Sequence, residues 1–404
     1  MFLENSLFSN KRASQRSIPL GASVAEVGNS KRSGSPKYNE RAKAPRLDPK
    51  LGSPLLLLSP EEGGFRLYKP DEDKFYETKS DFSVYRFLAS SGKWFLVVDS
   101  RWDLYIIDVF SEEKIHLPPL ESIQGGLYMV EREGSNDFKV TLIGGSLKGH
   151  WCVHTTEYLR GLLWVDDKNG DFVVVWQFEQ GQFLGFCKKG DLHYRDIPIR
   201  VDVRREFRGL QDVVLKGYNL YILVNRSFIR HLDLSGQDGF KDVSATPRFP
   251  IWVSAFGRDL GISEIKKVIS FSDSIAVTTS GDVLLVFTTA FESLGERSRI
   301  FHVYKRDPEK ELKRNICGTS LVEVESIGDE ALFFDFGITV PADHTLGIEP
   351  NCIYFTRNDR FGHKDGSIPC LVDICVYNIA TRTFKRFPSL SNLKLKDAMW
   401  FLPS

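Results

Sequence analysis

The chain lacks several features that would assign it to a common class. Its 404 residues contain no run of eighteen apolar residues, so we expect no membrane-spanning segment. Lys and Arg together number 53, as do Asp and Glu, and a net charge of zero gives no case for nucleic acid or an anionic membrane as partner. The six cysteines are scattered, and no secretory signal peptide precedes them. The sequence therefore predicts reduced, buried thiols in an intracellular protein; the cysteines are Cys152, Cys187, Cys317, Cys352, Cys370 and Cys375.

Common catalytic motifs are also missing. The sequence contains no G-x-S-x-G elbow, no G-x-x-x-x-G-K-[ST] loop and no G-x-G-x-x-G after an expected strand. The nearest similarity is GGSLKG at Gly144, which lacks the Lys-Ser/Thr pair and a following helix, so we interpret it as a hairpin turn. Asp329 and Glu330 belong to an expected turn, where acids cap and solvate. We predict no enzyme, no catalytic residue and no cofactor.

One group has metal-ligand residue types. His150, Cys152 and His154 alternate along an expected strand, so all three would line one face with ligands that zinc or copper accepts. Three ligands along one strand span roughly 13 Å, too far to close on one ion without a bend, and we predict no metal site. Cys370 and Cys375 face opposite sides because their spacing is odd. Asn225 begins a formal glycosylation sequon, which we expect to be unused without a secretory route.

The chain is rich in short apolar runs separated by polar turns. In residues 92–120, GKWFLVVDSRWDLYIIDVFSEEKIHLPPL, apolar runs at Trp94–Val98 and Leu104–Val109 precede a third run that begins at Lys114–Leu117. These runs are four to six residues long and rich in aromatic and β-branched residues, which favour a pleated sheet. The stretch therefore predicts a strand meander.

The same pattern recurs downstream. In each unit the second run ends at Asp or Asn, as at Asp108 and Asn378, and after a turn a basic residue leads to an apolar one, as at Lys114 and Lys385. A meander repeated in fixed internal order is typical of radial repetition. We predict an all-β fold, a single β-propeller of about six to eight four-stranded blades, since a blade uses roughly 45 residues. The later units are residues 170–199, 216–243, 281–314 and 350–388.

The ends of the ordered region predict how the ring closes. We expect Leu55–Leu58 and Trp400–Leu402 to share a blade or lie in adjacent blades, because closure removes two exposed sheet edges. GGFRLYKP, KFYET and SVYRFLAS, within residues 63–90, would form a first blade. Residues 150–163 and 248–279 are less regular, and a short helix or a turn fits residues 256–273.

Residues 1–50 differ from the rest. They carry ten Lys or Arg against four Asp or Glu, a net charge of +6, with sparse apolar residues and many Ser, Asn, Gly and Pro. Such composition predicts a disordered arm. A basic, Ser-rich start is also typical of a transit peptide, but Glu4 and the lack of an apolar face argue against one. Both interpretations stay open, and the location is cytoplasm or nucleus for a tail, or mitochondrion or plastid for a leader.

Several of these sequence runs resemble those of a known family. The runs WFLVVDS, LYIIDVFSEEKIHLPPL, LKGYNLYILVNRSFIRHLDLS, VEVESIGDEALFFDFG, EPNCIYFTRND and DICVYNIATRTFKRFP resemble the plant KIB-type β-propeller family, a domain of unknown function mostly found in F-box proteins. The resemblance covers residues 53–404 and is most specific at Ser326–Phe334 and Asn351–Thr356. It implies a non-enzymatic propeller that captures proteins, in many members for ubiquitination.

The arm departs from the family pattern. Residues 1–50 contain neither the Leu-Pro opening nor the Cys-x-x-Trp end of an F-box, which makes binding to a ligase scaffold doubtful. The predicted function is a protein-interaction module with an unknown partner and unknown binding residues. The alternatives are a substrate-recognition subunit of a ubiquitin ligase and a propeller enzyme with channel carboxylates. Two or more acids with perturbed pKa that converge on a deep polar pocket would favour the enzyme, whereas an open rim with exposed aromatic residues would favour the binding module.

Overall fold

The computed structural model describes residues 52–403, apart from twelve internal gaps. The predictions for the arm, the Asn225 sequon, Cys317 and Cys370 lie outside the described residues, as does most of the irregular stretch that precedes residue 267. The gaps are residues 78–81, 136, 145–147, 156–158, 179–182, 200–209, 225–227, 238, 245–266, 294–295, 308–320 and 358–371.

The predicted meander forms a four-stranded antiparallel sheet, β4-β5-β6-β7. All five residues of β5 and all five of β6 are buried, because apolar side chains on both faces pack against neighbouring sheets. Gly92, with φ of 60°, occupies the tight turn between β4 and β5. The meander prediction is confirmed; the strands are β4 Arg86–Ser91, β5 Trp94–Val98, β6 Leu104–Asp108 and β7 Lys114–His116.

The two ends of the described chain share one sheet, in the order β28-β1-β2-β3. Leu55 pairs with Phe401 and Leu56 with Trp400, which confirms the predicted closure. The expected first blade is correct only in part, since residues 86–91 pair with β5 in the next sheet. The strands are β1 Leu55–Pro60, β2 Arg66–Lys69, β3 Lys74–Tyr76 and β28 Leu395–Phe401.

Two further four-stranded sheets follow, β11-β12-β13-β14 and β15-β16-β17-β18, each antiparallel throughout. β12 is buried along seven of its eight residues, as expected for a strand inside a blade. The strands are β11 Leu159–Asp166, β12 Asp171–Phe178, β13 Phe183–Lys188, β14 Arg195–Pro198, β15 Leu210–Lys216, β16 Asn219–Val224, β17 Phe228–Asp233 and β18 Lys241–Asp242.

The C-terminal part contains two blades joined into one nine-stranded sheet, β22-β21-β20-β19-β24-β23-β25-β26-β27. A single parallel pair, Val277 and Ile338, makes the junction. The strands are β19 Lys267–Val277, β20 Val283–Ser293, β21 Glu296–Arg306, β22 Leu321–Glu323, β23 Glu330–Phe333, β24 Ile338–Pro341, β25 Cys352–Phe355, β26 Cys375–Asn378 and β27 Thr383–Lys385. Three short 3-10 helices are described as well, η1 Leu120–Ser122, η4 His344–Leu346 and η5 Pro388–Leu390.

An additional three-stranded sheet, β10-β9-β8, lies between the second and third blades in the sequence. Residues 151–155 form the strand expected at His150–His154, whereas residues 159–163, placed in the less regular stretch, belong to a strand as well. Residues 267–277 of the second less regular stretch are also a strand, and the first part of segment 256–273, where a short helix or turn was expected, lies outside the described residues. The inserted strands are β8 Tyr128–Glu133, β9 Asp137–Leu142 and β10 Trp151–Thr155.

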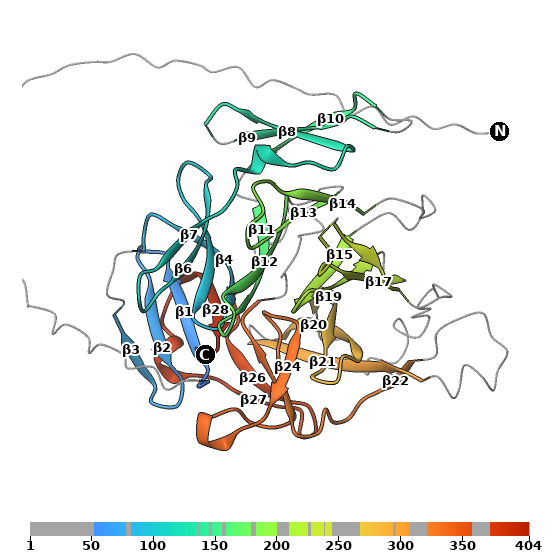
Figure 1. The fold of residues 1–404 in the computed structure, drawn as a ribbon. Helices are drawn as coiled ribbons and strands as arrows, with labels where there is room; N and C mark the ends of the chain where they lie inside the picture. Colours follow the sequence, from blue (N-terminus) through green and yellow to red (C-terminus); the bar gives the residue numbers. More distant parts are fainter. Residues whose placement is uncertain are drawn as a thin grey trace, which may run out of the picture. The chain divides into compact units, whose positions relative to one another are not determined.

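The innermost strands of the sheets meet around a common centre (Figure 1). Contacts run from β28 to β4, then to β11, β15, β19 and β24. Trp400 closes the ring by donating its backbone N–H to Asp335 at 2.9 Å. The described residues thus form six blades, five of four strands and one of five, which confirms a β-propeller within the predicted range.

Close approach of β4 and β11 depends on a glycine. A Cβ atom at Gly161 would lie 2.5 Å from Leu96 Cδ2 and 3.2 Å from Leu88 Cβ, closer than side chains pack. Glycine therefore lets the two innermost strands approach where a larger residue would separate them.

Candidate functional site

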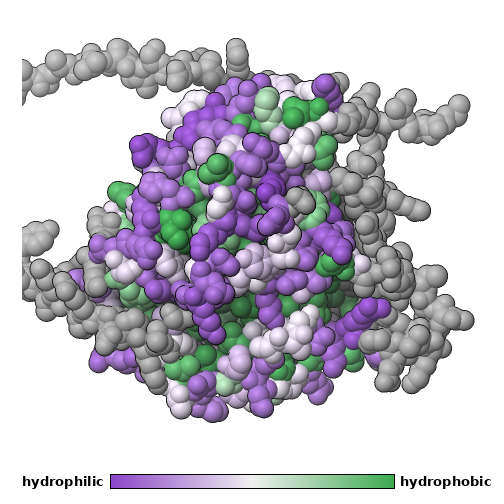
Figure 2. Space-filling view, in the orientation of Figure 1, coloured by the Kyte–Doolittle hydropathy of each residue, from purple (hydrophilic) through white to green (hydrophobic). Residues whose placement is uncertain are grey.

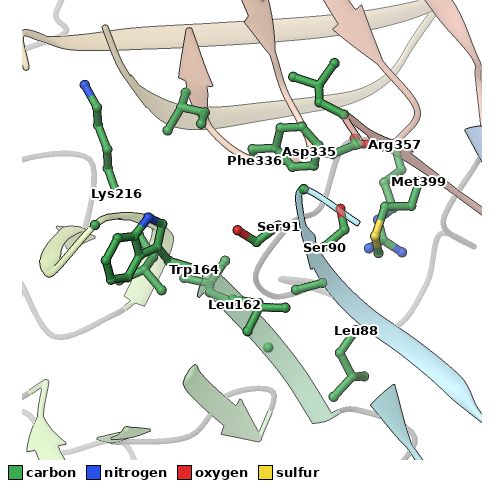
Figure 3. A pocket seen from close by; sticks show the side chains of 18 residues that line it. Leu88, Ser90, Ser91, Leu162, Trp164, Lys216, Asp335, Phe336, Arg357 and Met399 are labelled. Atoms are coloured by element: carbon green, nitrogen blue, oxygen red, sulfur yellow. The ribbon is translucent and has the colours of Figure 1, made fainter. Parts of the chain in front are cut away.

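A pocket of about 210 Å³ lies where the innermost strands meet, and we call it the axial pocket (Figure 3). β4, β11, β15, β24 and β28 all contribute lining residues, so its walls come from five blades. Most of the lining is apolar, with Leu88, Leu162, Phe336 and Met399 among the residues. A pocket of this kind could hold a small apolar group, and its few polar side chains would orient that group.

Asp335 is the one carboxylate among the described residues that line the axial pocket. Burial raises its pKa to about 6, although Arg357 and hydrogen bonds from the Trp400 N–H and the Thr356 hydroxyl favour the charged form. Acid–base catalysis by carboxylates uses two groups, one as the proton donor and the other as the proton acceptor or nucleophile. A single carboxylate cannot fill both roles. The axial pocket therefore does not meet the condition set for a propeller enzyme.

The other polar groups of the axial pocket join neighbouring blades. Lys216 Nζ donates to the backbone oxygens of Thr278 and Thr279 at 2.5 and 3.0 Å, linking β15 to the chain after β19. Ser91 Oγ accepts the N–H of Val165 at 3.0 Å, linking β4 to β11. These side chains have structural hydrogen bonds that explain their presence at the centre.

A larger and more open hollow, of about 440 Å³, lies between the first two blades. We call it the rim groove; its lining comes from residues 57–65, 83–87, 98–102 and 396–399. Val84 is 62% exposed there, one of seven exposed large hydrophobic residues in the described chain. Phe65, Tyr85 and Trp102 add aromatic surface that is half-buried. The groove is open and aromatic, but its aromatic side chains are half-buried, so it meets only in part the expectation of an open rim with exposed aromatic residues.

Trp102 is held in an unusual conformation at the rim groove. Its φ of 68° is left-handed, which for a bulky residue costs on the order of 1–3 kcal/mol unless the surroundings fix it. Asp99 supplies the fixing contacts, because its Oδ1 accepts the N–H groups of Arg101 and Asp103 and its backbone oxygen accepts that of Trp102. The indole N–H donates to the Ser135 oxygen at 3.0 Å. The ring is thus positioned before any ligand arrives.

Charges of both signs border the rim groove. Glu61, Asp99 and Asp397 provide carboxylates, while Arg86 and Lys396 provide cations. The Arg86 guanidinium lies 6.0 Å from the centre of the Trp102 ring, a cation–π distance. An apolar centre with a mixed polar rim is the usual anatomy of a protein-binding surface.

The three candidate metal ligands, His150, Cys152 and His154, do not come together around one point. Cys152 and His154 share a face of β10, and Cys152 Sγ lies 3.0 Å from His154 Nε2, but His150 precedes the strand. His154 stacks on Phe178 with ring centres 5.3 Å apart, so it packs against the third blade. Within the described ranges, no three His, Cys, Asp or Glu side chains come close enough to hold a metal ion.

The remaining candidate residues have structural roles and line neither pocket. Cys187, Cys352 and Cys375 are buried free thiols, as predicted, and burial raises the pKa of each thiol. Cys152 is also a free thiol but is half-buried, so the prediction of burial is wrong for it. Gly144 belongs to the connection between the antiparallel strands β9 and β10, which agrees with the hairpin interpretation. Glu330 lies at the start of β23, not in a turn, and accepts the Thr279 hydroxyl.

Neither pocket could be located from the sequence. Asp335 follows an apolar run in LFFDFG, and only the ring closure brings it against Trp400. Trp102 is a turn residue between two strands, and its left-handed φ leaves no mark in the sequence. The Asp99 to Asp103 spacing was the available signal, since two acids that flank a turn predict side-chain capping of its N–H groups.

The fold and the two pockets define a β-propeller with one carboxylate at its centre and an aromatic groove on its rim. Among the residues described, no helix is long and apolar enough to cross a membrane. The sequence model of the KIB1-4 beta-propeller family matches residues 67–378, and the chain belongs to this family.

Relatives in Arabidopsis thaliana support this assignment. The chain is 44% identical to "F-box protein At5g25290" over 363 residues, which are 88% of this chain and 86% of that protein. It is 34% identical to "F-box protein KIB4" over 332 residues, 79% of this chain and 74% of that protein. For "F-box protein KIB3" the identity is 31% over 370 residues, with 87% and 73% covered.

Proposed function

We propose that this chain is a non-enzymatic protein-interaction module that holds a segment of a partner protein in the rim groove. The observation that carries the proposal is that one groove is lined by the exposed side chain of Val84 and by Trp102, whose backbone turn and indole N–H are fixed by hydrogen bonds. An aromatic ring that is already fixed loses little entropy on binding, and Trp is among the residues that most often dominate binding energy. The single carboxylate of the axial pocket gives the competing enzyme proposal no acid–base pair.

Affinity capture from plant extract tests the proposal. The baits are the full-length chain, a Val84→Asp variant and a Trp102→Ser variant, with Leu192→Asp as the matched control because Leu192 is 86% exposed and does not line the groove. We expect proteins captured by the wild type and the control to be depleted at least fivefold from both groove variants. Equal capture by all four baits, at equal thermal midpoints, would contradict the proposal.

A second candidate function rests on the names of the relatives. Several are called F-box proteins, so we propose as the alternative that this chain recognises substrates for a ubiquitin ligase. Co-purification of the full-length chain with the ligase scaffold protein would support this role. A chain that captures partners through the rim groove without the scaffold would support the simpler module.

A further inference from the structure

The exposed face of the inserted sheet β8–β10 carries apolar residues at one end and along β10, and charged residues over the rest of β8 and β9. Four of the seven exposed large hydrophobic residues of the described chain belong to this sheet or its border, and they are Met129, Ile143, Trp151 and Val153. Figure 2 shows hydrophobic surface among hydrophilic residues in the region where β8, β9 and β10 lie in Figure 1. The opposite face packs on the third blade through Tyr128 and Phe138.

β10 is an edge strand in the described structure, because its sheet has the order β10-β9-β8. Leu142 donates its N–H to the His150 oxygen at 2.8 Å, and this bond fixes which residues of β10 face β9. In an antiparallel pair the direction alternates, so Cys152 and His154 face β9. The backbone N–H and C=O groups of Trp151, Val153 and Thr155 therefore point to the open edge.

The two edges of this sheet differ in how they are protected. The edge strand β8 carries Glu131, Arg132 and Glu133, charged residues of the kind that discourage strand addition. β10 has the sequence WCVHT, with no Asp, Glu, Lys, Arg or Pro. Its outward backbone groups belong to the exposed residues Trp151 and Val153, so a strand added here would find apolar side chains beside it.

The charges on the exposed face indicate which side chains an added strand should carry. In the strand register Thr155 lies opposite Asp137, which lies opposite Glu133, so that end of the sheet is acidic. At the other end Trp151 and Met129 both lie opposite Thr141, so that end is largely apolar. Between the two ends, Val153 lies opposite Lys139, which lies opposite Glu131, so this middle row carries one charge of each sign, and Lys139 Nζ lies 5.5 Å from the centre of the Trp151 ring. The excess negative charge is therefore at the Thr155 end, and the surface complements a segment that is apolar at one end and basic at the other.

We propose that β10 binds an extended segment of a partner protein as a fourth strand of the inserted sheet. On its exposed face this segment carries two apolar residues and one basic residue at alternate positions. The apolar residues lie beside Trp151 and Val153, and the Lys or Arg lies beside Thr155. Backbone hydrogen bonds supply affinity and the alternate side chains supply specificity, as in other strand-addition complexes. This surface shares no residue with the lining of the rim groove, so the proposal does not depend on the one above.

The probe is a fluorescent synthetic peptide, Thr-Arg-Thr-Val-Thr-Val-Thr, measured by anisotropy against the full-length chain. The matched peptide has Glu in place of Arg. We expect the Arg peptide to bind at least tenfold more tightly, and this difference to shrink to about threefold or less in an Asp137→Asn, Glu133→Gln variant. Equal binding of the two peptides overturns the proposal.

Two variants at one position test the edge itself. Val153→Pro removes an outward N–H and leaves the bonds from β10 to β9, so it should raise the Kd of the Arg peptide at least tenfold without lowering the thermal midpoint. Val153→Thr keeps the N–H and should stay within about threefold of the wild type. If proline prevents folding, a Val153→Asp, Trp151→Thr variant, which keeps the backbone N–H groups but removes the apolar side chains beside the added strand, should also raise the Kd of the Arg peptide at least tenfold.

Self-association is the competing outcome. If the chain dimerises in light scattering, the dimer is lost in Val153→Pro and the peptide does not bind, then a second copy occupies the edge and the proposal is overturned. Loss of peptide binding in Val84→Asp, which changes only the rim groove, would also contradict it.

Discussion

Trp94 and Phe355 fill the space between neighbouring blades. Trp94 is 7% exposed, packs in the core shared with the third blade and donates its indole N–H to Asp167 at 2.6 Å. Phe355 is fully buried, with the Phe301 ring 5.2 Å away and the Arg299 guanidinium 4.4 Å from its centre. Their places in corresponding runs of the repeat predict that both side chains are buried between blades, and the structure confirms it.

Replacing either aromatic residue with Ala should destabilise the fold. Trp94→Ala and Phe355→Ala should each cost about 3–5 kcal/mol of unfolding free energy, through lost apolar burial and a cavity. Denaturant unfolding measures the cost, with Leu192→Ala as the exposed control that should change little. Unfolding midpoints equal to wild type in both variants would contradict the assignment of these residues to the blade interfaces.

Asp335 should make stability depend on pH in an unusual direction. Burial raises its pKa from 3.8 to about 6, so the native state keeps the proton to higher pH than the unfolded chain does. The contribution of this group is therefore greatest below about pH 4 and declines as the pH rises to about 6. The size of the decline is on the order of 3 kcal/mol.

An Asp335→Asn variant isolates this effect. Acids with lowered pKa, such as Asp373, act in the opposite direction, but they are common to both proteins and cancel in the difference. The stability of the wild type minus that of the variant should fall between pH 4 and pH 6, measured by urea unfolding. Parallel stability curves for the two proteins would show that Asp335 titrates normally.

At the scale of the element, the repeated Asp or Asn has a physical explanation. Asp108 Oδ1 accepts the N–H groups of Phe110 and Ser111, Asp233 Oδ1 accepts that of Ser235, and Asn378 Oδ1 accepts that of Thr381. In each of these three blades this residue ends the next-to-last strand and stabilises the turn to the last. The sequence revealed this pattern because the hydrogen bonds are local.

Features that depend on distant contacts were harder to predict. The start of β11 was expected to be irregular because it opens with LRG before its apolar run, and the alternation along β10 predicted a strand but not the sheet that it joins. The assignment of residues 86–91 to the second blade depends on pairing with β5, and the local pattern fits either blade. The rim groove depends on how two blades meet, which no local spacing encodes.

Removing β28 tests closure of the ring. A chain that ends at residue 394 leaves β1 without its inner neighbour and exposes Leu55 and Leu57 at an open edge. We expect this truncation to aggregate or to lose cooperative unfolding in size-exclusion chromatography and circular dichroism. Deletion of Ser404 alone is the control, and a monomeric, cooperatively folded truncation would contradict the account of closure.

At the scale of the molecule, residues 1–50 are predicted to be separable from the propeller. Their few apolar residues and net charge of +6 offer little to a core, so deleting them should leave the thermal midpoint within about 2 °C of wild type. A fusion of these residues to a fluorescent protein tests their role as an address. Import into mitochondria or plastids would support a leader, and a diffuse cytosolic and nuclear signal would remove that interpretation.

The most direct test of the proposed function is site-specific photocrosslinking from the rim groove. A photoreactive amino acid replaces Val84 in one sample and Leu192 in the other, two exposed positions of which only Val84 lines the groove. After illumination in plant extract, position 84 should yield a discrete protein adduct that is absent from position 192 and suppressed by Trp102→Ser. Adducts of equal pattern and yield from both positions, or none from position 84, would contradict a protein-binding role for this groove.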